Sequence, residues 1–155
     1  LRCDEDEALA TGAHGVFYPH GTGHILGLDV HDMEHFGDRP SYPADQPRPT
    51  QFGTRFLRLD LPLEAGWVVT VEPGLYAVPE IIHDDALRSE LGDRIDWAKA
   101  EAWIGFGGIR IEDDVAVTSG APDVLSAATP KTLAELDGLV GEGPSVAERL
   151  GVTGF

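Results

Sequence analysis

Three histidines lie close together in a glycine-rich segment, in the order His20-Gly-Thr-Gly-His24 and then His31. On an extended backbone alternate side chains share a face, so His20 and His24 would look into one pocket. Imidazoles are common metal ligands, and the intervening glycines would let a ligand or a metal ion approach. Ordinary hydrogen bonding in a core or on the surface is the alternative. The helical zinc motif is excluded, because Gly21 stands where that motif has a glutamate.

Two other places carry carboxylates beside strand-like segments. Glu72 follows the β-branched run 67–71 and precedes a Pro-Gly turn, so it would point from a rigid rim; a plain surface glutamate is the alternative. A period of two puts Arg110, Glu112 and Asp114 on one strand face, between isoleucines that we expect to be buried. Such a face needs a partner or a metal, unless it holds a simple Arg–Glu pair. One imidazole and two carboxylates would suit a divalent catalytic ion.

The elements that must position these residues are short and of both kinds. Each has a local signal: capping residues, β-branched runs, alternation, or a density of proline and glycine. We expect a helix that ends at Gly12, short strands and turns over 14–31, a long loop over 32–55, a strand over 67–71, helix and loop over 84–103, a strand or hairpin over 107–118, and a helix from Pro130 with Thr129 as its N-cap. The class is α+β, in one unit.

Composition excludes several functions. The chain has 155 residues, with 11 Lys and Arg against 27 Asp and Glu, a net charge of −16. Such a charge repels nucleic acid and anionic lipid, so we expect neither as a partner. The apolar fraction of 42% is that of a globular protein, and no apolar run approaches the length of a membrane span. Cys3 is the single cysteine, which excludes an intrachain disulfide and favours a cytoplasmic location.

The order and spacing of three motifs resemble the Xaa-Pro peptidases of the pita-bread metallopeptidase fold. The motifs are His20-Gly-Thr-Gly-His24-Ile-Leu-Gly-Leu-Asp-Val-His31-Asp, Val71-Glu72-Pro-Gly-Leu-Tyr76 and Gly108-Ile-Arg110-Ile-Glu112. The likeness runs from residue 1 to about residue 120 and is strongest to the dipeptidase branch, prolidase. It implies half of a pita-bread fold, in which helices cover a curved antiparallel sheet.

The resemblance also implies a dinuclear metal site. Family members hold two divalent ions, commonly manganese, with two aspartates, one histidine and two glutamates. Position by position, His24 matches the metal histidine, and Glu72 and Glu112 match the two metal glutamates. Carboxylate and imidazole ligands suit cobalt and zinc as well. A hydroxide that bridges the two ions would be the nucleophile.

The same likeness assigns the residues that would handle the substrate. His20 and His31 match histidines that contact substrate and steady the tetrahedral intermediate, and Glu72 would also move the proton. Arg110 matches the arginine beside the last metal glutamate, and Arg58 matches the arginine that grips the free carboxylate of a dipeptide. The implied reaction is hydrolysis of Xaa-Pro dipeptides with release of proline.

The two metal aspartates of the family lie upstream of the histidine motif, and this sequence begins without Met just before that motif. Residues 1–155 are therefore expected to be the C-terminal part of a catalytic domain, inactive without the N-terminal half and a homodimer when complete. An exposed sheet edge and apolar face would follow. Three other functions stay open: an aminopeptidase P that trims longer Xaa-Pro peptides, a hydrolase with one zinc-like ion, and a non-catalytic pita-bread binding module.

Overall fold

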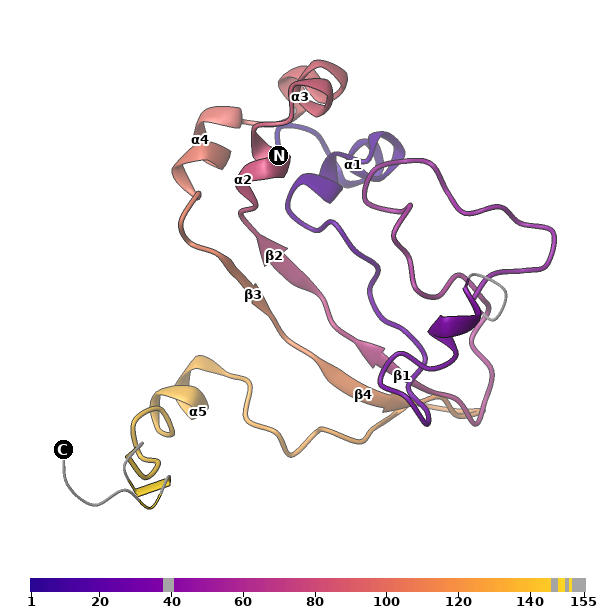
Figure 1. Ribbon diagram of the computed structural model, residues 1–155, viewed down its shortest axis with the longest axis vertical. Helices are drawn as coiled ribbons and strands as arrows, with labels where there is room; N and C mark the ends of the chain where they lie inside the picture. The colour runs from indigo at the N-terminus through magenta and orange to yellow at the C-terminus, as the bar shows by residue number, and fades with distance from the viewer. Residues whose placement is uncertain (38–40, 146–147, 150, 152–155) are drawn as a thin grey trace.

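A long antiparallel ribbon forms the backbone of the fold in the computed structural model, which describes residues 1–37, 41–145, 148–149 and 151 (Figure 1). Its strands are β1 (Val68–Val71), β2 (Gly74–Tyr76), β3 (Gly108–Arg110), β4 (Asp113–Ala116) and β5 (Asp123–Val124). One sheet has the order β1-β4-β5, and the other pairs β2 with β3. Because β1 leads into β2 and β3 leads into β4, the two sheets follow one another along the same two stretches of chain. The predicted α+β class with an antiparallel sheet is confirmed.

The ladder is interrupted where the two sheets meet. Pro73 follows β1 and has no N–H to donate, so regular pairing stops there. Its carbonyl oxygen still accepts a hydrogen bond of 3.2 Å from the amide of Ile111. The segment 107–118, expected as one strand or a hairpin, is therefore two strands, which pair with β2 and β1 rather than with each other. Glu72 and Glu112 both lie at this interruption.

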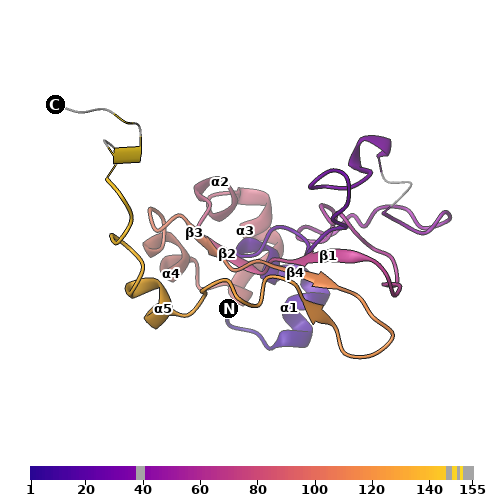
Figure 2. The same ribbon diagram turned by 90° about the horizontal axis from the view of Figure 1, so that it is seen from below.

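The helices gather at the β2–β3 end of the ribbon (Figures 1 and 2). Helix α1 (Glu5–Thr11) has Asp4 as its N-cap and ends at Gly12, whose positive φ of 77° suits glycine, as predicted. The other helices are α2 (Pro79–Ile82), α3 (Asp85–Leu91) and α4 (Trp97–Ala102), with 3-10 turns at Ala13–Val16, Glu34–Phe36 and Gly92–Arg94. Small and aliphatic side chains from these elements and from residues 77 and 95 form the core: Ala8, Ala13, Val16, Ala77, Ile82, Leu91, Ile95 and Ala100. The hydrophobic core thus anchors one end of the ribbon, and the site lies farther along it.

The C-terminal segment extends away from this body and carries α5 (Leu133–Asp137) (Figure 1). Its N-cap is Thr132 rather than the predicted Thr129. The correction has a local cause: Thr132 and Glu135 form a capping box, in which each side chain satisfies the other residue's backbone N–H.

A second prediction that was wrong is the burial of two isoleucines on the ribbon. Ile109 and Ile111 were predicted to be buried, but they are 55% and 50% exposed. Neither side chain belongs to the hydrophobic core that the described residues form. Within the same residues, no helix is long and apolar enough to cross a membrane.

Candidate metal and substrate site

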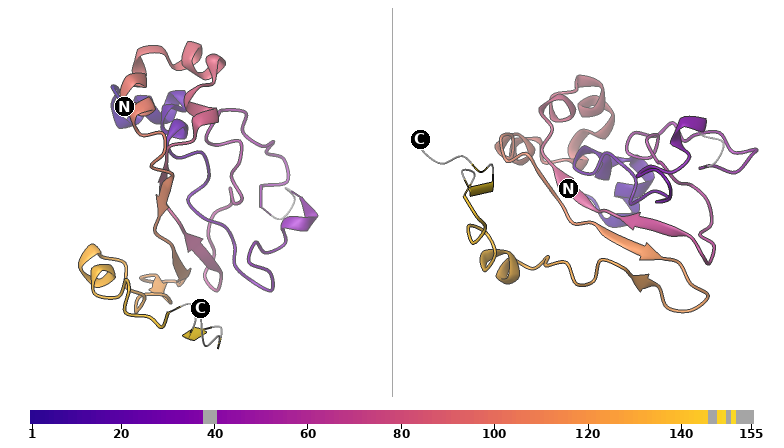
Figure 3. Two further views of the ribbon diagram at one scale, coloured as in Figure 1. Left: turned by 60° about the vertical axis from the view of Figure 1, so that its left-hand side comes forward. Right: turned by 60° about the horizontal axis from the view of Figure 1, so that its bottom comes forward.

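The histidine segment runs along the free edge of β1. The amide of Thr70 donates to the carbonyl of His24 at 2.9 Å, and the amide of Glu72 donates to the carbonyl of Thr22 at 2.7 Å. A β-bridge joins Ile25 to the same strand. The segment and the long loop after it lie on one side of the ribbon (Figure 3, left). β1 is thereby flanked by β4 on one edge and by the histidine segment on the other.

Gly23 makes this approach sterically feasible. A Cβ atom at that position would lie 1.8 Å from the carbonyl oxygen of Thr70, a distance that no side chain tolerates. The glycines of this segment were predicted to leave room for a ligand or a metal ion. At Gly23 the structure shows instead that the absent side chain admits the backbone of β1.

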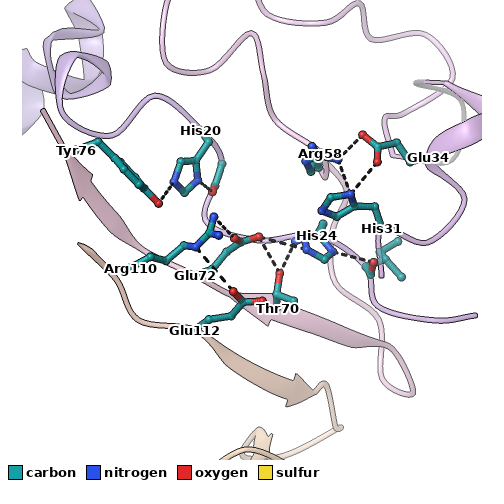
Figure 4. A network of polar contacts seen from close by, with 12 residues as sticks. His20, His24, His31, Glu34, Arg58, Thr70, Glu72, Tyr76, Arg110 and Glu112 are labelled. Atoms are coloured by element: carbon teal, nitrogen blue, oxygen red, sulfur yellow. Dashed lines mark hydrogen bonds and ion pairs between the residues drawn. The ribbon is translucent and has the colours of Figure 1, made fainter. Parts of the chain in front are cut away.

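His24 and Glu72 meet at the centre of the site (Figure 4). Nε2 of His24 lies 3.3 Å from Oε1 of Glu72, and the two residues are 4% and 8% exposed. The hydroxyl of Thr70 accepts from the amide of His24 at 3.0 Å and donates to Oε1 of Glu72 at 3.2 Å. This hydroxyl holds the imidazole and the carboxylate in one fixed relation.

The tautomer of His24 follows from its other nitrogen. Nδ1 lies 3.0 Å from the carbonyl oxygen of Ile25, which can only accept, so Nδ1 carries the proton. When Nδ1 alone carries a proton, Nε2 turns its lone pair toward Glu72. Two acceptors this close are stabilised by a cation between them, either a proton or a metal ion. The separation of 3.3 Å is one that two ligands of the same ion can adopt, with bonds of about 2.0–2.2 Å to nitrogen and oxygen. The donor pair therefore fits a metal ion.

Arg110 connects this pair to the second carboxylate. Its Nη1 lies 3.0 Å from Oε2 of Glu72, and its Nε lies 3.8 Å from Oε2 of Glu112. One guanidinium therefore contributes positive charge to both carboxylates. Glu112 is joined to the centre through Arg110, and within the described part of the chain no group of three His, Cys, Asp or Glu is arranged to hold a metal. The three-ligand set His24, Glu72 and Glu112 stays a prediction.

The remaining residues surround this centre. Tyr76 donates its hydroxyl to Nε2 of His20 at 3.0 Å, because Nδ1 of that ring faces the carbonyl of Gly21. The rings of His24 and His31 meet edge to face, with centroids 4.4 Å apart. One cavity of about 400 Å³ is lined by all seven residues that the sequence singled out: His20, His24, His31, Arg58, Glu72, Arg110 and Glu112. The structure brings the whole predicted set together.

Three further residues belong to the site and had no role in the sequence analysis. Thr70 could have been found, because it lies in β1 two positions before Glu72, which directly follows that strand, and alternate residues of an extended chain share a face. Tyr76 stands inside a quoted motif, yet nothing in the motif shows that it contacts His20. Glu34 forms an ion pair with Arg58, which lies 24 positions later, and no local pattern indicates that contact.

Comparison with known proteins agrees with this arrangement. The sequence pattern of metallopeptidase family M24 matches residues 5–119, so the chain belongs to that family. A Xaa-Pro dipeptidase of Xanthomonas euvesicatoria pv. vesicatoria (strain 85-10) is 39% identical over 131 residues, which cover 81% of this chain and 28% of that protein. A probable Xaa-Pro aminopeptidase of Ajellomyces capsulatus is 42% identical over 140 residues, which cover 90% of this chain and 28% of that protein.

Solved structures support the fold. Aminopeptidase P from E. coli with the inhibitor Pro-Leu superposes with a TM-score of 0.50 and 35% identity, over 89% of this chain and 23% of that one. Aminopeptidase PepP of Pseudomonas aeruginosa gives a TM-score of 0.51 and 34% identity, over 89% and 24%. The fold is that of the pita-bread metallopeptidases, and the chain spans about a quarter of the length of these relatives.

Proposed function

We propose that this chain carries one side of the active site of a metal-dependent Xaa-Pro peptidase, in which His24, Glu72 and Glu112 hold divalent ions. The observation that supports this most directly is the buried pair of His24 Nε2 and Glu72 Oε1, 3.3 Å apart, with the imidazole tautomer set for a cation. Membership of metallopeptidase family M24 supports the same reaction class. Manganese is the expected metal, with cobalt and zinc as alternatives.

Charge balance supports a dinuclear site completed from elsewhere. Two divalent ions bring four positive charges, whereas Glu72 and Glu112 supply two negative ones. We therefore propose that residues 1–155 form the C-terminal part of the catalytic domain and that an upstream portion contributes two aspartates. The homodimer and the cytoplasmic location, the latter inferred from the single cysteine, stay predictions.

The residues of this chain would then divide the work of peptide hydrolysis. When bound, the metal ions would acidify a water molecule and polarise the scissile carbonyl. Glu72 would accept the proton of that water and pass it to the departing proline nitrogen. His31 would donate to the developing oxyanion, and His20, held by Tyr76, would orient the substrate beside it. Arg58 would bind the free carboxylate of the dipeptide in its planar fork.

Removal of the first residue from longer Xaa-Pro peptides is the second candidate. One observation favours it: the guanidinium of Arg58 is already paired with Glu34, so a substrate without a carboxylate at that point would leave the pair intact. We still favour hydrolysis of Xaa-Pro dipeptides, because Arg58 lines the cavity that contains Glu72 and Glu112.

The test is Mn²⁺-dependent release of proline from Ala-Pro by the full-length polypeptide that contains this chain. We expect His24→Ala to lower kcat/KM by at least about a hundredfold, because metal ligands and the groups that orient them control affinity and activity to that extent. His83→Ala is the matched control, since His83 is exposed at the end of α2, outside the cavity. Residues 1–155 alone should be inactive. Equal turnover by the isolated chain, or by the His24 variant, would refute the proposal.

A further inference from the structure

Arg58, to which we assign the substrate carboxylate, is not free in this structure. Its Nη1 is paired with Oε1 of Glu34 and also lies 2.9 Å from Nδ1 of His31. The other carboxylate oxygen of Glu34 lies 2.9 Å from the same Nδ1. A carboxylate of the chain itself therefore engages Nη1, one of the donor atoms that a substrate carboxylate could use (Figure 4).

Arg58 and His31 lie between two neighbouring cavities. One, of about 340 Å³, is lined by Glu34 together with Arg58 and His31. The other, of about 400 Å³, contains Glu72 and also has Arg58 and His31 in its wall. Arg58 thus faces both cavities, whereas Glu34 contacts it from the side away from Glu72. A guanidinium with five N–H donors can exchange one carboxylate for another across such a boundary.

The backbone before Glu34 supports a dedicated placement. Met33 is the N-cap of the 3-10 turn Glu34–Phe36 and has a φ of 61°, the one positive φ of a non-glycine residue among the described positions. Left-handed backbone is unfavourable for methionine and points to a functional constraint where it occurs. Met33 is 43% exposed, so core packing does not force this conformation.

We propose that Glu34 is a specificity-determining residue that competes with the carboxylate of the substrate for Arg58. The inference rests on the proposed function, and in particular on Arg58 as the anion site. The side chains of Arg58 and Glu34 are 44% and 54% exposed, and an ion pair so exposed is weak enough to be displaced. A free dipeptide competes with Glu34 for Nη1 of Arg58, whereas a substrate amidated on proline does not. Glu34 therefore reduces the preference of the site for dipeptides over longer substrates.

The test compares Ala-Pro with Ala-Pro amide on the full-length protein. We expect Glu34→Gln to lower the KM for Ala-Pro about two- to fivefold relative to the KM for Ala-Pro amide, the range of an exposed ion pair. Glu80→Gln removes an equal charge from an exposed position in α2, outside both cavities, and should change neither substrate. In an Arg58→Gln background, Glu34→Gln should have no further effect.

Calorimetric binding of the same two peptides to the metal-free protein separates this inference from the proposed function. A protein that binds Ala-Pro more tightly after Glu34→Gln, but releases no proline with Mn²⁺, would refute the peptidase and leave the competition intact. An unchanged ratio of affinities for acid and amide overturns the competition. The competition is also refuted if Glu34→Gln weakens the affinity for Ala-Pro, which would mean that Glu34 positions Arg58. It is refuted as well if neither the parent protein nor Glu34→Gln binds Ala-Pro.

Discussion

Replacing Gly23 by alanine tests how the histidine segment is held against β1. The added Cβ would lie 1.8 Å from the carbonyl oxygen of Thr70 and 2.8 Å from its carbonyl carbon, so the segment must move away. That movement weakens the bonds from Thr70 N to the His24 carbonyl, from Glu72 N to the Thr22 carbonyl, and from His24 N to the Thr70 hydroxyl. The carboxylate and the imidazole of the site would separate with it.

The magnitude follows from these contacts. Each hydrogen bond is worth about 1 kcal/mol net, and overpacking of a tight contact costs about 1–3 kcal/mol. Partial loss of the three bonds together with residual strain predicts a decrease of about 2–4 kcal/mol in the free energy of unfolding. Alanine also lowers the conformational entropy of the unfolded chain, and this effect raises the free energy of unfolding by at most about 1 kcal/mol.

Urea unfolding of the full-length protein, followed by tryptophan fluorescence, measures this loss. Gly120→Ala is the control, because a Cβ there meets only the Thr118 hydroxyl at 3.9 Å, an ordinary contact. It should change the free energy of unfolding by no more than about 0.5 kcal/mol. If Gly23→Ala behaves like this control, the close pairing of the histidine segment with β1 is refuted.

Two other changes probe single interactions. Thr70→Val keeps the shape of the side chain but leaves the amide of His24 and one oxygen of Glu72 without their shared partner; we expect a loss of about 1–3 kcal/mol by urea unfolding, largely restored by Thr70→Ser. The pKa of Asp96 lies below its ordinary value of 3.8, mainly because the Arg2 guanidinium hydrogen-bonds to it and also because it accepts from the first-turn amide of α4. A lowered pKa in the folded state stabilises the protein above the ordinary value, and that contribution is lost as the pH falls through the folded-state pKa. The unfolding midpoint of Asp96→Asn, which keeps an N-cap acceptor, should therefore lie below that of the parent at pH 6, and the difference should shrink below about pH 4; a difference independent of pH would contradict this.

Local signals account for the elements that were predicted well. Helix α1 lies between an aspartate cap and a glycine with positive φ, and β1 coincides with a β-branched run that ends before a proline. In both cases the residues that decide the structure lie within a few positions of one another. The candidate site was also largely visible, because motif order and spacing selected seven residues that line one cavity.

Other features depend on partners that are distant in the sequence. The alternating pattern predicted that Ile109 and Ile111 are buried, but such a pattern cannot show whether another element covers them, and both are exposed. The N-cap of α5 was misplaced, although the capping box of Thr132 and Glu135 is itself a local signal that could have been read. The two errors differ in kind. The exposure of the isoleucines depends on the tertiary structure, whereas the N-cap of α5 is indicated by the spacing of Thr132 and Glu135 in the sequence.

By itself the sequence determined helix α1 and strand β1, the family to which the chain belongs, and the set of acidic, basic and imidazole side chains available for chemistry. Only the tertiary structure decided that residues 22–26 lie along β1, that Arg110 stands between Glu72 and Glu112, and that Glu34 occupies Arg58. The physical reason is the separation along the sequence over which each interaction acts. Caps and propensities act within one or two turns of chain, whereas these contacts join residues that are brought together only when backbone pairing and core burial close the loops between them.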